Sequence, residues 1–197
     1  MWLLIVLWVS WCCLHSLLIT LTVKHWIEAK SGAWLGLYRL SYVCFSIATL
    51  LPLLWYTGTL PQHRLVAPSG WLQGLQAILL FYGLILFLGG LRVYDLSAFL
   101  GTRQWREYQT GRKSPPPAFV HTGILRFVRH PWYSGGIALL WSLPALTDVT
   151  LVTRLILTSY LVIGTLLEER KLNAALGEQY RAYCRQVPML FPWKLGR

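Results

Sequence analysis

Long apolar runs, separated by shorter polar stretches, dominate the chain. The first run covers 2–23, the second 40–57 and the third 71–91. A helix needs about 20 apolar residues to cross the hydrocarbon core of a bilayer, and each run is close to that length. The first run has no basic segment before it and no small-residue cleavage site after it. We therefore expect a retained membrane helix there rather than a signal peptide.

A fourth apolar stretch, 132–167, is too long for one crossing. A helix rises about 1.5 Å per residue, and the hydrocarbon core is about 30 Å thick. Pro144 and Asp148 interrupt the stretch, so the pattern predicts two helices, 132–146 and 149–170, joined by a tight turn. The sequence thus predicts an all-α polytopic membrane protein with about five transmembrane helices and a C-terminal cytosolic cofactor-binding segment.

The composition and the charge pattern agree with this membrane assignment. Hydrophobic residues make up 55% of the chain and charged residues only 13%, whereas an ordinary soluble domain is about 25% charged. The formal net charge is +11. The Lys and Arg residues concentrate in segments that the five-helix topology places on one side, namely 24–39, 92–130 and 170–197. Basic loops mark the cytosolic side of a membrane.

This charge distribution predicts an integral membrane protein. We expect the N-terminus outside, and the C-terminus and any active site in the cytosol. The partner that the basic charge indicates is then the lipid bilayer and not nucleic acid. The sequence does not indicate an oligomeric state.

Two segments carry candidate chemistry. In the first, Arg129 and His130 precede Pro131, and proline is favoured at the first position of a helix. A helix that begins there offers amide donors and partial positive charge to a carboxylate or phosphate. In the second, Glu168 and Glu169 stand together at a membrane boundary, where carboxylates are costly and tend to be functional. The plainer interpretations are an anchor to lipid headgroups for the first segment and an interfacial ion pair for the second.

The predicted hairpin of the last two helices brings these segments together. Its antiparallel helices place His130–Tyr133 opposite Glu168–Glu169 at the cytosolic end. A zwitterionic amino acid head needs carboxylates for its ammonium group, and Arg, His and amide donors for its carboxylate. S-adenosylmethionine carries such a head. Its adenine needs apolar or aromatic neighbours, and four are available in these segments: Phe119, Val120, Leu125 and Trp132.

An ordered set of motifs occupies 95–193. The run GILRFVRHPWYSGG contains the pattern G-x-x-R-x-x-R-H-P-x-Y-x-G. The later run EERKLNAALGEQYRAYCRQVPMLFP contains three patterns in order: E-E-x-x-L, Gly-Glu-x-Tyr, and a Tyr before Val-Pro. Together these motifs resemble the isoprenylcysteine carboxyl methyltransferase superfamily. That superfamily of integral membrane methyltransferases includes phospholipid methyltransferase-like and nitric-oxide-reductase-accessory-like relatives. The stretch 94–108 and the run RQVPMLFP look similar to its bacterial branch that includes methanethiol S-methyltransferase.

The resemblance implies an enzyme that transfers a methyl group from S-adenosylmethionine and releases S-adenosylhomocysteine, without a metal. Residues 1–91 would form N-terminal membrane helices, and 92–197 the catalytic core of a single domain. The resemblance implies these cofactor-binding residues: Pro117, Ala118, Phe119, Val120, Gly123, Leu125, His130, Pro131, Tyr133, Glu168 and Tyr183. It implies that Arg129, His130 and Glu169 support or complete the catalytic site.

The methyl acceptor stays open at this level. Members of the superfamily often carry Tyr where this chain has Leu125, and the prenylcysteine enzymes carry Arg where it has Gly164. The second difference weakens a prenylcysteine substrate in particular. Small or lipophilic acceptors, either a thiol or sulfide or an isoprenylcysteine-like compound, fit the resemblance.

Two other classes of function also stay open. One is a non-catalytic membrane accessory protein of a respiratory or nitrogen-oxide pathway, in which the N-terminal helices and His15 would act. The other is a lipid-binding scaffold. A histidine inside a membrane helix more often hydrogen-bonds a neighbouring helix than binds a cofactor.

Overall fold

The computed structural model describes residues 1–30, 35–66, 69–112, 119, 121–144 and 146–194, and every regular element within them is a helix. The predicted all-α class is therefore confirmed. The contacts between residues divide the chain into two compact units. Unit 1 comprises Met1–Pro61 and Asp95–Ala118, and unit 2 comprises Gln62–Tyr94 and Phe119–Arg197. Each unit is described by itself below.

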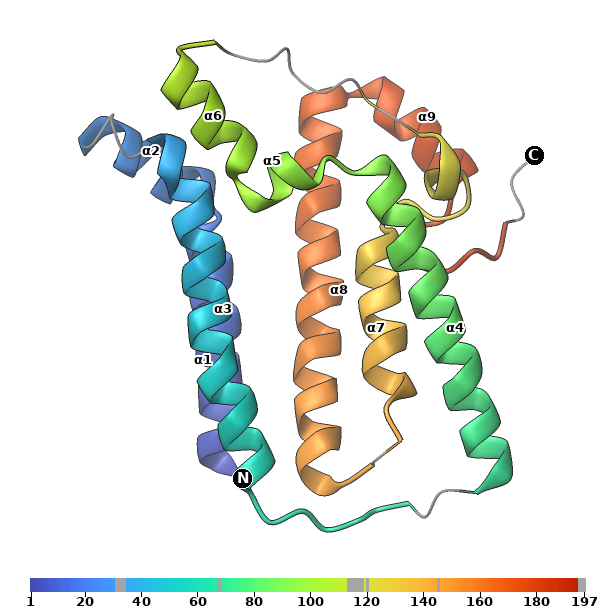
Figure 1. The fold of residues 1–197 in the computed structure, drawn as a ribbon. Helices are drawn as coiled ribbons and strands as arrows, with labels where there is room; N and C mark the ends of the chain where they lie inside the picture. Colours follow the sequence, from blue (N-terminus) through green and yellow to red (C-terminus); the bar gives the residue numbers. More distant parts are fainter. Residues whose placement is uncertain (31–34, 67–68, 113–118, 120, 145, 195–197) are drawn as a thin grey trace. The chain divides into compact units, whose positions relative to one another are not determined.

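Unit 1 is built around two long helices that lie side by side, α1 and α3 (Figure 1). Its helices are α1 (Trp2–Leu18), α2 (Leu21–Lys30), α3 (Leu35–Thr59), α5 (Leu96–Leu100) and α6 (Thr102–Thr110). The predicted helix over 2–23 ends five residues early, at Leu18. The Thr20 hydroxyl donates to the carbonyl of Leu17 at 2.8 Å and satisfies a backbone acceptor at this helix end.

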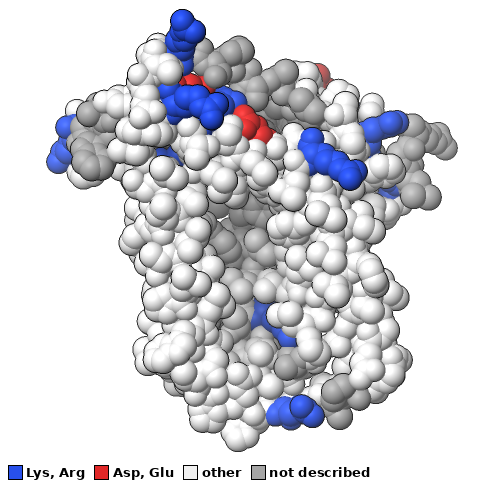
Figure 2. All heavy atoms as spheres, in the orientation of Figure 1, with Lys and Arg blue, Asp and Glu red and all other residues white. Residues whose placement is uncertain are grey.

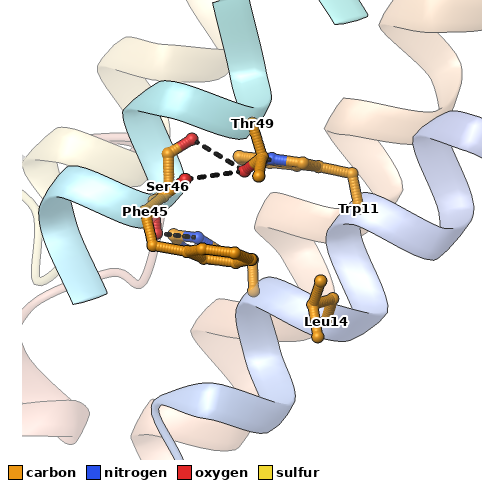
Figure 3. A pocket seen from close by; sticks show the side chains of 6 residues that line it. Trp11, Leu14, Phe45, Ser46 and Thr49 are labelled. Carbon is orange, nitrogen blue, oxygen red and sulfur yellow. Dashed lines mark hydrogen bonds between the residues drawn. The ribbon is translucent and has the colours of Figure 1, made fainter. Parts of the chain in front are cut away.

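Side-chain hydrogen bonds join α1 to α3 (Figure 3). The indole of Trp11 donates to Thr49 Oγ1 at 3.1 Å. Next to it, His15 Nδ1 lies 3.0 Å from Ser46 Oγ, and His15 Nε2 lies 2.7 Å from the Tyr42 hydroxyl. Between apolar helices, such bonds satisfy polar groups that lipid cannot. The structure thus places His15 in contacts with a neighbouring helix, which was the plainer expectation for it.

Unit 2 holds the two segments that carry the candidate chemistry. Its elements are α4 (Gly70–Val93), the short 3-10 helix η2 (Gly123–Arg126), α7 (Pro131–Ser142), α8 (Asp148–Leu176) and α9 (Glu178–Gln186). The α7–α8 hairpin was predicted, but both of its helices end elsewhere than expected. Helix α7 stops at Ser142 because Leu143 precedes a proline and is extended. Helix α8 continues to Leu176, where Gly177 with a φ of +56° ends it.

Glycines allow α4 and α7 to approach closely. A Cβ atom added to Gly83 would lie 2.7 Å from Leu139, and one added to Gly135 would lie 3.1 Å from the carbonyl oxygen of Gly83. A Cβ at Gly90 would collide with the indole of Trp132, which donates to a backbone carbonyl of α4 at 3.2 Å. Small residues at helix contacts are typical of membrane proteins. This contact fixes the first turn of α7 against α4.

Three helices of the described ranges are long and apolar enough to cross a membrane: α3, α4 and α8. Helix α1 is apolar but has 17 residues, and α7 has 12. In each unit the flanks of the long helices are almost entirely free of charge, and the charged residues gather mainly toward α6 in unit 1 and toward α9 in unit 2 (Figure 2). The membrane assignment is therefore supported, whereas crossings by α1 and α7 and the orientation stay predictions.

Candidate functional site

The segment before α7 meets the last turns of α8, as the hairpin predicted. His130 is the N-cap residue of α7, and Pro131 occupies the first position of the helix. Across the gap, His130 Nε2 lies 2.7 Å from Glu169 Oε1, and His130 Nδ1 lies 4.0 Å from Glu168 Oε2. The side chain of Tyr133 lies near the Glu168 carboxylate. The predicted juxtaposition is confirmed, and the roles of these residues stay predictions.

Glu169 is the centre of a nearly buried hydrogen-bond network. Its side chain is 13% exposed. Its Oε1 accepts from Arg129 Nε at 2.9 Å, from His130 Nε2 at 2.7 Å and from the Tyr180 hydroxyl at 2.6 Å. Its Oε2 accepts from Arg129 Nη2 at 2.8 Å and from the Cys184 thiol at 3.7 Å. Burial and the hydrogen bond to Glu169 raise the pKa of Tyr180 above its ordinary value.

Arg129 is equally constrained. Besides its two bonds to Glu169, its Nη1 donates to the carbonyls of Cys184, at 3.2 Å, and Val187. Four of the five guanidinium N–H donors thus bind the protein itself. Burial opposes its charge, but the hydrogen bonds and charge of Glu169 raise the pKa of Arg129 above its ordinary value. The Arg129–Glu169 pair therefore acts as a rigid framework for the site.

Glu168 lies in a different environment from its neighbour. Its side chain is 44% exposed, and its Oε2 lies 4.0 Å from the imidazole Nδ1 of His130. Successive residues of a helix point about 100° apart, so one glutamate of the pair turns into the network and the other turns away from it. Glu168 is consequently the carboxylate that can bind a cationic ligand.

Helix α9 folds back on the site and contributes an aromatic cluster. Tyr180, Tyr183 and Val187 form a buried core, against which Phe119 packs. The ring centroid of Phe119 lies 5.4 Å from that of Tyr183, and the two rings are edge to face. The Tyr183 hydroxyl donates to the carbonyl of Leu125 at 2.5 Å. This cluster adjoins the network because Tyr180 belongs to both.

The segment after α9 holds the backbone next to His130. The amide of Arg129 donates to the carbonyl of Pro188 at 3.0 Å, and the amide of His130 donates to that of Met189 at 3.2 Å. The hydroxyl of Tyr82 on α4 lies 3.3 Å from the carbonyl of Leu190. Residues 188–190 thus form hydrogen bonds with both the motif and α4.

The remaining candidate residues are only partly in this arrangement. Gly123 has a φ of +59°, which favours glycine, and begins η2. Trp132 packs against α4 with its ring centroid 4.7 Å from that of Tyr94, not in the cluster with Phe119. Three of the predicted adenine-pocket residues lie outside the described residues: Pro117, Ala118 and Val120.

Two residues of the network had no predicted role. Tyr180 was part of the Gly-Glu-x-Tyr motif, three residues before Tyr183, so both lie on the same face of α9. That spacing was a usable signal. Cys184 gave none, because its position beside Glu169 depends on how α9 folds back on α8.

The comparisons with known proteins agree with the motifs. A family model described as NnrU protein matches residues 3–189. Methanethiol S-methyltransferase of a Pseudomonas species is 34% identical over 79% of this chain and 60% of its own length. The protein of that name from Mycobacterium tuberculosis is 31% identical, over 87% of this chain and 73% of its own length. Nurim of Bos taurus is 28% identical, over 81% and 63%.

The chain spans 55–61% of the length of the first three methanethiol S-methyltransferases that it matches. No solved structure matches it. The family resemblance predicted from the motifs is confirmed: the chain belongs to the NnrU protein family, in the superfamily of membrane methyltransferases related to isoprenylcysteine carboxyl methyltransferase and nurim.

Proposed function

We propose that the protein transfers a methyl group from S-adenosylmethionine to a small thiol at the membrane. The observation that carries the proposal is the half-exposed Glu168 carboxylate at the N-terminal end of α7, beside His130 and Tyr133. Relatives named methanethiol S-methyltransferase, about 30% identical over most of this chain, support the reaction and the class of acceptor.

The residues present fit the amino acid head of the cofactor. Glu168 supplies an accessible negative charge for the ammonium group. The N-terminal end of α7 supplies partial positive charge, which suits the carboxylate group. The cluster of Phe119 and Tyr183 lies next to the network and offers aromatic surface to the adenine.

S-adenosylmethionine, when bound, supplies a methyl group on a sulfonium that is already a good leaving group. The chain's own residues then need to bind, orient and exclude water. In this proposal Glu168 binds the ammonium, and Tyr133 positions the Glu168 carboxylate. Arg129 and Glu169 keep the ring of His130 in one orientation. Leu125 and Pro131 contribute to the cofactor site by positioning the backbone around it. Gly123 contributes by allowing the turn at which η2 begins.

The proposal extends to topology and domain organisation. Residues 92–197 would form the cofactor-binding core, and 1–91 would add membrane helices. The basic segments 92–130 and 170–197 favour a cytosolic site, a cytosolic C-terminus and an outer N-terminus in a bacterial inner membrane.

A binding experiment in detergent tests the cofactor site. S-adenosylhomocysteine at a hundredfold excess over its dissociation constant should stabilise the wild-type protein by about 2.7 kcal/mol. Glu168→Gln should lose most of the resulting shift in Tm, whereas Glu178→Gln, the same change at an exposed carboxylate of α9, should retain it.

A transfer assay with a radiolabelled methyl donor tests the acceptor. It should cover small thiols, prenylcysteine analogues and phospholipids, and we expect label in the small thiols. A wild-type protein that neither shifts with S-adenosylhomocysteine nor transfers label would refute the proposal and favour a non-catalytic accessory protein.

A further inference from the structure

The imidazole ring of His130 has one nitrogen in the buried network and the other outside it. Nε2 lies 2.7 Å from Glu169 Oε1. Glu169 also forms two bonds with the guanidinium of Arg129, so it is an ionised carboxylate that only accepts hydrogen bonds. Nε2 therefore carries a hydrogen. In the neutral ring the lone pair then lies on Nδ1.

Nδ1 faces a second acceptor rather than a donor. Glu168 Oε2 lies 4.0 Å from it, and no donor in the described part of the chain forms a hydrogen bond with it. The His130 side chain is 3% exposed, so its ring is held in place, and Nδ1 lies at the edge of the exposed Glu168 carboxylate. At this distance the lone pair on Nδ1 and the Glu168 carboxylate do not bond each other. Both can therefore accept a hydrogen that a ligand donates.

Carboxylates flank both nitrogens of the ring. An imidazolium would have Glu169 on Nε2 and Glu168 near Nδ1, while the charge of Arg129 is already compensated by its bonds to Glu169. The arrangement matches that of a histidine base oriented by a carboxylate. In such a pair the carboxylate, here Glu169, fixes the imidazole ring and stabilises the positive charge that forms on it. The titratable or charged side chains next to the ring are Glu168, Glu169 and Tyr133. Beyond them, Arg129, Tyr180 and Cys184 bond to Glu169, and Tyr94 interacts with Tyr133 and Glu168.

A small thiol needs such a base. The thiolate is the reactive nucleophile, and an ordinary thiol with a pKa of about 8.5 is only a few per cent ionised at neutral pH. We propose, resting on the function proposed above, that His130 Nδ1 is the general base for the thiol acceptor. The S–H bond breaks, its proton moves to Nδ1, and the electron pair stays on sulfur. That sulfur forms the new S–C bond as the C–S bond of the sulfonium breaks, and the proton later leaves Nδ1 for solvent.

The competing role for Nδ1 is a hydrogen bond to the ammonium group of the cofactor. The two roles differ in their dependence on the acceptor. A base matters only when the acceptor carries a proton that must be removed, whereas a cofactor contact matters equally for every acceptor.

The variant His130→Gln separates the two roles. Glutamine keeps an N–H donor for Glu169 but has no basic nitrogen. Its kcat is measured at saturating S-adenosylmethionine with an alkanethiol and with an aromatic thiol that is ionised at the assay pH. We expect the loss of kcat with the alkanethiol to exceed the loss with the ionised thiol by about 100-fold, because a general base contributes about 10²–10⁴-fold. Glu178→Gln serves as the matched surface control.

The possible outcomes separate this inference from the proposed function. Equal losses with both thiols, or no loss with either, would overturn the role of Nδ1 as a base. If His130→Gln does not fold, the pH profile of the wild-type protein decides. With a base, kcat for the alkanethiol rises with pH and levels off well below the pKa of the thiol itself, which is about 8.5. A flat profile, or a rise that follows the ionisation of the thiol, overturns the inference. A wild-type protein inactive on every thiol would instead refute the proposed function itself.

Discussion

Glu168 and Glu169 are adjacent in sequence, but their surroundings predict different effects of the same substitution: a loss of ligand binding at Glu168 and a loss of stability at Glu169. In Glu169→Gln the buried Arg129 loses its charged partner. The two side chains are 9% and 13% exposed, and breaking a buried ion pair costs about 3–5 kcal/mol. Glutamine retains one acceptor oxygen, and Arg129 retains its carbonyl acceptors in Cys184 and Val187. We therefore expect a loss near the lower end, about 3 kcal/mol.

This loss has a measurable thermal signature. For a chain of this size, 1 kcal/mol shifts Tm by about 2–4 °C. Glu169→Gln should thus lower Tm in detergent by about 6–12 °C. Glu168→Gln, at a side chain that is 44% exposed, should change the free energy of unfolding by less than about 0.5 kcal/mol. It should instead lose the stabilisation by S-adenosylhomocysteine.

A double-mutant cycle attributes the loss to the ion pair. Arg129→Met combined with Glu169→Gln should cost at least about 1 kcal/mol less than the sum of the single substitutions, because the two side chains are in contact. Additive losses would show that the pair is not the source of the destabilisation. Equal changes in Tm for Glu168→Gln and Glu169→Gln would contradict the division of roles between the glutamates.

Three further substitutions test the packing around the site. Gly135→Ala places a Cβ 2.9 Å from a side-chain carbon of α4, so thermal unfolding should show a loss of about 1–3 kcal/mol. Gly164→Ala places a Cβ 3.2 Å from the ring of Tyr133; Tm should not fall, since alanine favours the helix by about 1 kcal/mol, but calorimetry should show weaker binding of S-adenosylhomocysteine. Tyr183→Phe leaves a backbone carbonyl of η2 without its donor and should cost about 1–3 kcal/mol in the same unfolding assay; an unchanged Tm would contradict that role.

The long helices could be predicted because their length alone identifies them. The basic segment 92–130, which the apolar pattern leaves between membrane helices, contains α5, α6 and η2. Its signals were local and polar: Asp95 caps α5 by accepting from the Ala98 amide at 3.0 Å, and Gly101 and Gly111 end helices with φ values of +92° and +65°. A search for apolar runs does not detect such helices.

The meeting of the two motif segments was also predictable, because a tight hairpin leaves little freedom at its open end. The division between Glu168 and Glu169 was not. It depends on the rotation of α8 about its axis relative to α7, which is set by close contacts such as that of Gly164 with the ring of Tyr133. The parts played by Tyr180 and Cys184 depend on the fold-back of α9, which no pattern within a single helix specifies.

The backbone bonds from Arg129 and His130 to Pro188 and Met189 join residues 59 positions apart in the chain. A ribosome makes the motif well before it makes its acceptors. The backbone amides of Arg129 and His130 therefore lack these acceptors until synthesis has passed residue 190. The order of translation thus makes the site one of the last parts of unit 2 to assemble, after the α7–α8 hairpin has been synthesised.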